Sequence, residues 1–360
     1  MPTVAPEPPA GLQPLPTLKK PVPLVPTPMK EFDPTYVERR KQITEKFLTL
    51  KNGRQLAYFT EGSPTDPAVL CLHSLGQSKM EWLFKEPLPG VFQIAVDRQG
   101  HGNSTPYPPV ALEAPRQFST DVAEYVELLD ALGVDKFYVT GSSMGGSWTI
   151  ALAASLPDRC LGAAPISALA SPWHSSLTTT AQRKRLLPDG FSLLFSINDS
   201  TCSGSLVRKL IRMAFPKAPT DRTVDPGFAK QYNRFFKYGT PNSKKLADDF
   251  AQMDADPFFV SRELDAHFYG GNCSDFGLVE QIRVFCKQGW GCDPSEIRCP
   301  TFIYQGALDA ETPLACAEHH KAIIPGAQLV VMPDRGHVTI LMRAEEIILA
   351  LVQGKAVAPS

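Results

Sequence analysis

The sequence predicts an α/β protein built on a mostly parallel sheet with helices on both faces. Two observations lead to this fold class. Short, continuous apolar runs recur along the chain, as expected for strands that are covered on both faces, and stretches with a single apolar stripe, typical of helices, lie between them. This alternation favours a parallel sheet. The 360 residues exceed the usual size of one core, so we expect either one large domain with an insertion or two domains.

The N-terminal segment predicts no regular structure. Its first 34 residues hold 11 of the 34 prolines, and a segment so rich in residues without an N–H builds neither helix nor sheet. We interpret residues 1–35 as a disordered, Pro-rich tail. A protein partner that binds this tail is conceivable, but a plain unstructured extension is the favoured reading.

Strands begin after this tail. Two β-like runs flank Lys51-Asn52-Gly53, which is a hairpin signal. Buried strands are then expected in the apolar runs at 68–72, 92–96, 137–140, 300–304 and 328–332. A helix is predicted over 119–132, where apolar residues form one stripe, and another over 340–351.

The alternation lapses between about Ser171 and Ser295, and we interpret 173–295 as an inserted, largely helical cap. Its aromatic residues are candidates for the lining of an apolar acyl pocket, although most are expected to form the core of the cap. These candidates are Phe191, Phe195, Phe228, Phe235, Phe236, Phe258, Phe259 and Trp290.

Composition excludes several function classes. Lys and Arg number 36 against 37 Asp and Glu, a net charge of −1, so neither a nucleic-acid nor a membrane-surface role is supported. Eight cysteines without a C-x-x-C pair, and a start without a secretory pattern, predict reduced thiols and a cytoplasmic protein. The uncharged stretch 137–156 is long enough to span a bilayer. Its glycines instead predict a buried strand, a sharp turn and a buried helix.

The run Gly141-Ser142-Ser143-Met144-Gly145 contains G-x-S-x-G. Acyl transfer needs a serine oxygen raised on a tight strand-to-helix turn, where larger neighbours would collide with the adjacent chain. A strand is predicted before this run and a helix from Met144 after it, as that turn requires. Ser143 is therefore the candidate nucleophile.

A serine alcohol needs a base, and His337 is the strongest of the seven histidines because it lies in a loop directly after an apolar run. Asp309 follows another apolar strand and would orient this histidine, with Glu311 and Asp334 as alternatives. The chain order Ser143, Asp309, His337 matches one of the known orders of the serine triad.

The segment Leu72-His73-Ser74-Leu75-Gly76 is placed to supply an oxyanion hole, which we assign to the backbone N–H groups of Leu75 and Met144. We interpret His73 as a buried brace of this loop.

Ser74 and His174 are further candidates for contacts with substrate. His319 and His320 are interpreted as surface residues of a helix rather than as metal ligands, so no metal is expected.

Four motifs together resemble the α/β-hydrolase superfamily, over roughly 46–172 and 296–353. They are Leu72-His-Ser-Leu-Gly76, Asp97-Arg-Gln-Gly-His-Gly-Asn-Ser104, Gly141-Ser-Ser-Met-Gly145, and Asp309 with Gly336-His337. The resemblance implies an eight-stranded, mostly parallel sheet, with a helical cap inserted after a sixth strand at 161–166. The loop His73-Ser-Leu-Gly76 departs from the usual His-Gly and is similar to that of some lactone-cleaving members.

These expectations point to a serine hydrolase, of the carboxylesterase type, that cleaves an ester, thioester or lactone of a small-molecule acyl substrate without a cofactor. Two alternatives stay open. The same triad serves hydrolysis of a C–C bond beside a carbonyl, and a hydrolase scaffold can also serve as a ligand-binding receptor.

Overall fold

The computed structural model describes residues 32–106, 117–187, 252–253, 255–271, 281–282, 284–285 and 289–359. Nearly all of the predicted Pro-rich tail, and the larger part of the predicted cap, lie outside these ranges. So do five of the aromatic pocket candidates, Phe191, Phe195, Phe228, Phe235 and Phe236.

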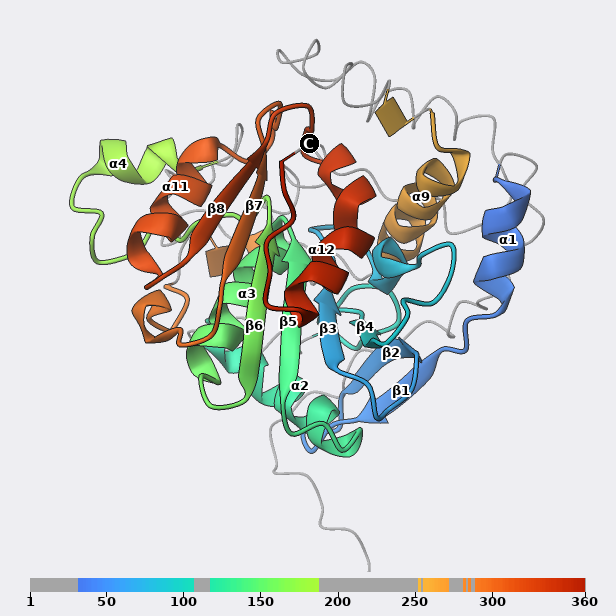
Figure 1. Cartoon of the computed structure of the whole chain (residues 1–360). Helices are drawn as coiled ribbons and strands as arrows, with labels where there is room; N and C mark the ends of the chain where they lie inside the picture. Colours follow the sequence, from blue (N-terminus) through green and yellow to red (C-terminus); the bar gives the residue numbers. More distant parts are fainter. Residues whose placement is uncertain are drawn as a thin grey trace, which may run out of the picture.

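Eight strands form one sheet (Figure 1), in the order β1-β2-β4-β3-β5-β6-β7-β8. Their bounds are β1 (Lys46–Thr49), β2 (Gln55–Glu61), β3 (Ala68–Leu72), β4 (Phe92–Val96), β5 (Phe137–Ser142), β6 (Cys160–Ile166), β7 (Phe302–Gly306) and β8 (Gln328–Met332). Only β1 with β2 and β2 with β4 pair in antiparallel fashion, and the other pairs are parallel. The predicted fold class is thereby confirmed.

Most helices occupy connections between strands, whereas α1 precedes β1 and α12 follows β8. The α-helices are α1 (Pro34–Lys41), α2 (Phe118–Ala131), α3 (Met144–Ser155), α4 (Thr180–Arg185), α9 (Pro257–Gly271), α11 (Leu314–Ile323) and α12 (Ala344–Val352). Short 3₁₀ turns are η1 (Lys79–Trp82), η4 (Pro294–Glu296) and η5 (Thr339–Arg343). The predicted helix at 340–351 is thus divided into η5 and α12.

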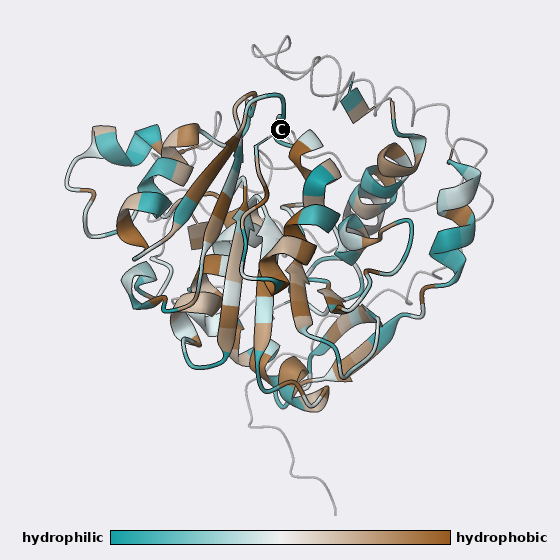
Figure 2. Cartoon of the chain, in the orientation of Figure 1, coloured by the Kyte–Doolittle hydropathy of each residue, from teal (hydrophilic) through white to brown (hydrophobic). Residues whose placement is uncertain are grey.

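Each face of the sheet has its own core. Along β3, Leu70 and Leu72 join the cluster that packs against α2 and α3, whereas Val69 and Cys71 join the cluster that contains α12 and α9. Successive strand side chains point to opposite faces, so a strand covered on both sides must be apolar throughout. Figure 2 shows this as brown strands in the middle of the molecule, with teal residues concentrated on the outer helices.

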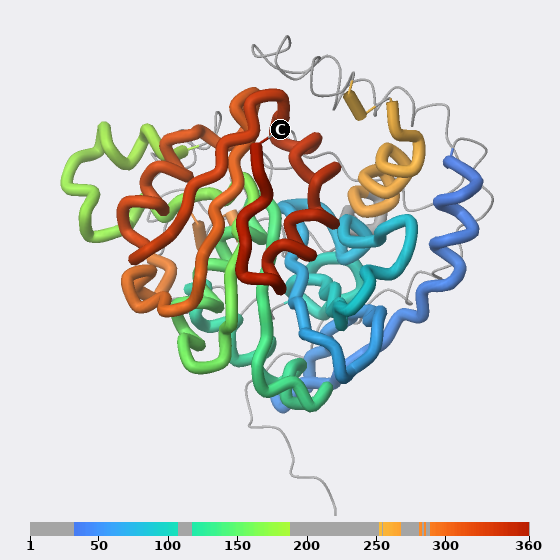
Figure 3. Tube along the Cα trace, in the orientation of Figure 1, coloured from blue at the N-terminus to red at the C-terminus, as the bar shows by residue number. Residues whose placement is uncertain are grey.

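The parallel strands all end at one edge of the sheet. Figure 3 shows β7 and β8, in orange and red, beside the green β6, with the blue β1 and β2 at the far side. Loops that follow β3, β5, β7 and β8 therefore meet at the same edge, where α/β sheets place their ligand sites.

The segment between β6 and β7 contributes directly to both cores. Phe258 and Phe259 of α9 pack in the cluster with α12, and Trp290 stacks on Phe118 of α2 with 5.2 Å between ring centroids. The structure therefore places these three aromatic candidates in packing contacts with the sheet's covering helices.

The sequence did not predict α1. Asp33 caps the helix by accepting a hydrogen bond from the backbone N–H of Tyr36. Two side chains of α1 then bind Asp265 of α9: the Tyr36 hydroxyl donates at 2.7 Å and Arg40 Nε lies at 2.6 Å. This polar helix, with its basic last turn, is held by these contacts with α9 and by Arg39, which pairs with Glu61 of β2 and donates to Phe84 O.

Residues 137–156 divide into β5 and α3, as predicted. Within the described ranges, no helix has the length and hydropathy needed to cross a membrane. The five cysteines in these ranges, Cys71, Cys160, Cys292, Cys299 and Cys316, are free thiols.

Candidate active site

The turn between β5 and α3 holds Ser143 in a conformation that few residues adopt. Its φ is 52° and its ψ −119°, in the left-handed region that favours glycine. The backbone N–H of Ser143 donates to Ile166 O at 2.8 Å, which ties the turn to the end of β6. Such strain persists only where the surrounding structure imposes it, and it is frequent at catalytic positions.

The glycines of this turn are required by close approaches. A Cβ on Gly141 would lie 2.5 Å from the carbonyl oxygen of Gly145, and one on Gly145 would lie 2.2 Å from that of Leu72. The second approach also brings the start of α3 against the loop after β3. The two amides assigned to the oxyanion hole, those of Leu75 and Met144, come from these two adjoining segments.

A histidine–carboxylate pair lies at the same edge of the sheet. Asp309, after β7, has its Oδ2 at 2.9 Å from Nδ1 of His337, after β8. Both side chains are largely buried, with exposed fractions of 1% for Asp309 and 9% for His337.

The carboxylate of Asp309 is itself fixed by three donors. Its Oδ1 accepts from the backbone N–H groups of Glu311 at 2.9 Å and Thr312 at 2.7 Å, and Oδ2 accepts from Gln305 Nε2 at 2.9 Å. Such a carboxylate can fix the tautomer of its histidine and leave Nε2 for chemistry.

Neither alternative carboxylate takes this position. Glu311 is half exposed and lies 3.6 Å from Nε2 of His337, the other ring nitrogen. Asp334 is also half exposed and pairs with Arg335. Among the three candidates, it is Asp309 that contacts Nδ1.

The loop after β3 is positioned by buried polar contacts. His73 is fully buried, its Nε2 accepts from the backbone N–H of Arg98 at 2.9 Å, and its Nδ1 donates to Ser74 O at 2.8 Å. Burial, reinforced by the charge of Arg98, lowers the pKa of His73 well below its ordinary value, so the ring is neutral. The prediction that His73 braces this loop is confirmed.

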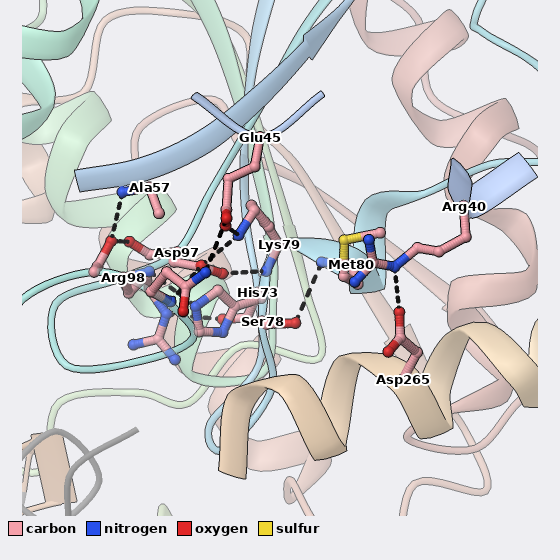
Figure 4. A network of polar contacts seen from close by, with 12 residues as sticks. Arg40, Glu45, Ala57, His73, Ser78, Lys79, Met80, Asp97, Arg98 and Asp265 are labelled. Atoms are coloured by element: carbon pink, nitrogen blue, oxygen red, sulfur yellow. Dashed lines mark hydrogen bonds and ion pairs between the residues drawn. The ribbon is translucent and has the colours of Figure 1, made fainter. Parts of the chain in front are cut away.

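Arg98, a buried residue of the loop after β4, supports the loop after β3. Its Nε donates to His73 O and its Nη2 to Ser74 O, each at 2.9 Å, and its guanidinium lies 4.9 Å from the ring centroid of Trp148. Figure 4 shows Arg98 and His73 side by side.

A buried ion pair anchors the loop that carries Arg98. Lys79 Nζ lies 2.6 Å from Asp97 Oδ2 and 2.5 Å from Glu45 Oε1 (Figure 4). Asp97 Oδ1 also accepts from the backbone N–H of Lys79 at 2.8 Å. The conformation of the 97–104 motif thus depends on η1.

Besides its carbonyl oxygen, Ser74 has its backbone N–H and its hydroxyl engaged. Its backbone N–H donates to Glu81 Oε2 at 2.9 Å, and its hydroxyl lies 2.8 Å from that of Ser142. Because this amide is already bonded, Leu75 is the better source of an oxyanion donor. A contact of Ser74 with substrate stays a prediction.

His174 lies apart from the histidine–carboxylate pair, beside α11. Its Nδ1 is 2.8 Å from Ser176 Oγ, and its ring meets His319 edge-on with centroids 5.2 Å apart. Its role as a substrate contact stays a prediction.

The expectation that His319 and His320 lie on the surface is wrong for His320. That side chain is fully buried on α11, near Trp290, and burial lowers its pKa to about 3. Burial likewise lowers the pKa of the half-buried His319 to about 4. Both rings are therefore neutral, and the described residues contain no group of three His, Cys, Asp or Glu side chains placed to hold a metal.

Sequence reasoning missed Glu81 and Arg98 as supports of the site. Arg98 stands within the 97–104 motif that carries part of the family resemblance, so the signal was present. Glu81 is a single carboxylate in a short 3₁₀ turn, and only its burial, with 2% of the residue exposed, distinguishes it.

Comparisons with known proteins agree with the observed fold. A family model described as the alpha/beta hydrolase fold matches residues 67–344. The chain is 33% identical over 114 residues to a Bacillus subtilis protein assigned as a 2-succinyl-6-hydroxy-2,4-cyclohexadiene-1-carboxylate synthase. That match covers 31% of this chain and only 40% of the relative. Lipase 3 of Moraxella sp. is 25% identical over 309 residues, covering 85% of this chain and 82% of the lipase.

Solved structures share the fold at low sequence identity. The enol-lactonase from Burkholderia xenovorans superposes with a TM-score of 0.55 at 17% identity, covering 86% of this chain and 99% of that one. The carboxylesterase CesB from Bacillus subtilis gives a TM-score of 0.52 at 16% identity, covering 89% and 97%.

Proposed function

Because this chain belongs to the alpha/beta hydrolase fold family, we propose that it is a serine hydrolase that cleaves a carboxylic ester, thioester or lactone through an acyl-enzyme on Ser143. The observation that carries the proposal is the His337–Asp309 hydrogen bond at the sheet edge where the strained turn presents Ser143. Packing alone does not require a strained serine or a buried, oriented imidazole, so a catalytic role is the better explanation of both.

In the proposed reaction, Ser143 Oγ attacks the carbonyl carbon of the substrate while Nε2 of His337 takes its proton. Asp309 keeps the remaining proton on Nδ1 and stabilises the imidazolium. The amides of Leu75 and Met144 stabilise the oxyanion, the second because the first N–H groups of a helix lack intrahelical acceptors. His337 then protonates the leaving group.

Deacylation repeats these steps with water. His337 removes a proton from the water molecule, which attacks the acyl carbon, and the proton then passes to Ser143 Oγ as the acid product leaves. Every proton is accounted for by His337, and the proposed reaction uses no cofactor.

Covalent labelling tests the nucleophile. We expect a fluorophosphonate probe to label the purified protein at Ser143, as mapped by peptide mass spectrometry. Ser143→Ala should abolish both labelling and ester hydrolysis, whereas Ser63→Ala, at an exposed position, should leave both unchanged. A folded wild-type protein that stays unlabelled would contradict the proposal.

A substrate panel tests the reaction class. The extended match to lipases favours p-nitrophenyl esters of several chain lengths as the first substrates. A lactone is included because the loop at 73–76 is similar to that of some lactone-cleaving members of the family. A panel of diketones beside them tests the alternative of C–C hydrolysis. Turnover of diketones alone would replace ester cleavage by that alternative.

A further inference from the structure

The carboxylate of Glu81 joins the oxyanion loop to the nucleophile turn. Its Oε2 accepts a hydrogen bond from the backbone N–H of Ser74 at 2.9 Å and another from Ser142 Oγ at 2.5 Å. The Ser74 and Ser142 hydroxyls are themselves 2.8 Å apart. One buried oxygen atom therefore connects a residue next to Leu75 with the residue next to Ser143.

We propose that Glu81 is a positioning residue for catalysis: its carboxylate fixes the spacing between the two backbone segments that supply the oxyanion hole. This inference rests on the proposed function, because it concerns the same oxyanion-binding amides of Leu75 and Met144. Glu81 acts through the loop and the turn and does not itself touch the reacting atoms.

Burying the carboxylate of Glu81 costs folding free energy, and packing alone does not require a carboxylate there. Its other carboxylate oxygen, Oε1, is buried without a hydrogen-bond partner among the described residues, and such an atom destabilises the folded state. Burial raises the pKa of Glu81, while the hydrogen bonds from Ser142 and Ser74 oppose the rise. An apolar side chain would fill the site at lower cost, so the acceptor function is what the site requires.

Two charged residues of α9 act on Glu81. Arg262 lowers its pKa, and Glu263, held by Arg262 at 2.9 Å, interacts unfavourably with it. Arg262 also lies 5.9 Å from the ring centroid of Phe84, just after η1. The oxyanion loop is thereby linked to the segment between β6 and β7.

Replacing the acceptor separates this role from packing. Glu81→Met keeps the length of the side chain and removes both hydrogen bonds, whereas Glu81→Gln keeps a neutral acceptor. We expect kcat to fall about 10- to 100-fold in Glu81→Met with KM nearly unchanged, because small displacements of oxyanion donors weaken transition-state binding selectively. Glu81→Gln should restore most of this loss, and Glu86→Met, at an exposed position, should have no effect.

A transition-state mimic provides the readout that a purely structural role would not change. A trifluoromethyl ketone forms a hemiketal in which Ser143 Oγ bonds to the carbonyl carbon, His337 takes the proton, and the oxyanion occupies the hole. Its inhibition constant should rise in Glu81→Met by the same factor by which kcat/KM falls. Unchanged inhibition, or a loss confined to KM, would overturn the inference.

Ser142→Ala keeps the test decisive if Glu81→Met does not fold. This variant removes the hydroxyl that donates to Glu81 and that also lies beside the Ser74 hydroxyl, so kcat should fall several-fold. An unchanged kcat in Ser142→Ala would argue against the positioning role. Fluorophosphonate labelling of wild-type protein, run in parallel, separates the two proposals: without labelling the hydrolase proposal fails, and with labelling but normal Glu81 variants only the positioning role fails.

Discussion

At the scale of single residues, Ser143 carries a conformational cost that agrees with its proposed role as the nucleophile. A non-glycine residue in the left-handed region costs about 1–3 kcal/mol, and Ser143 has φ 52°. The same turn needs glycine at positions 141 and 145, because a Cβ at either would collide with adjacent backbone.

This cost predicts that a variant that relieves the strain at position 143 gains stability while it loses activity. Ser143→Ala and Ser143→Gly both lose the hydroxyl, but only glycine adopts this conformation without strain. We expect Ser143→Gly to be more stable than Ser143→Ala by about 1 kcal/mol in urea unfolding, with both inactive. Equal stability of the two variants would show that the turn is not strained.

The carboxylate of Asp309 gives a second prediction at this scale. Asp309→Asn preserves shape but removes the charge and the preference for a proton on Nδ1 of His337. We expect kcat to fall about 10³- to 10⁴-fold with little change in stability, measured on the best ester substrate. The exposed Asp334→Asn is the matched control, and a similar loss there would assign the orienting role differently.

At the scale of elements, α9 is notable for the acidic side chain that it buries. Glu263 has only 2% of its side chain exposed, against Arg262, and burial raises its pKa to about 7. An unfolded glutamate titrates near pH 4.3, so the folded state holds this proton more tightly than the unfolded state does.

A stability profile tests this. Because the folded state binds more protons between about pH 4.5 and 7, the contribution of Glu263 to stability is complete below that window and is lost as the pH rises through it. In Glu263→Gln we expect the free energy of unfolding to fall less steeply with pH across this window than in the wild type. Urea unfolding at several pH values measures both slopes. The exposed Glu318→Gln should leave the slope unchanged, and an unaltered slope in Glu263→Gln would contradict the assignment.

At the scale of the whole molecule, α1 and α9 clamp one side of the fold through Asp265. Arg40 and Asp265 form an ion pair whose side chains are almost fully buried, and removal of one partner of such a pair costs about 3–5 kcal/mol. The Pro-rich segment before α1 is predicted to contribute nothing to the stability of the folded protein.

Two truncations separate these segments. A chain that begins at residue 32 should unfold at the same urea concentration as the full chain. A chain that begins at residue 43 should be markedly less stable, because Asp265 then loses both Tyr36 and Arg40. If both truncations behave alike, α1 is not a stabilising part of the fold.

Sequence patterns predicted the sheet better than its surroundings, for a physical reason. Strands such as β3 are buried on both faces, so their residues are apolar throughout and the run is visible in the sequence. The chain order of Ser143, Asp309 and His337 was readable for a similar reason, since each follows a strand that ends at the same edge.

Elements held by distant polar contacts were not visible. Nothing local in α1 reveals that Asp265 will bind Tyr36 and Arg40, and nothing in η1 reveals that Glu81 will accept from Ser74. His320 was misplaced because its position on a helix does not tell which neighbours cover it. Partners far apart in the chain determine these features.

The neighbouring positions of β6 and β7 have a consequence for how such proteins diversify. Ile166, the last residue of β6, pairs with Tyr304 of the parallel β7, and Thr301 just before β7 pairs with Ala163, so the chain re-enters the sheet beside the strand that it left. Closing a long excursion costs only slightly more entropy than closing a short one. Grafting the corresponding stretch from a related protein is therefore a practical route to chimeras, provided that the graft keeps the packing residues Phe258, Phe259 and Trp290.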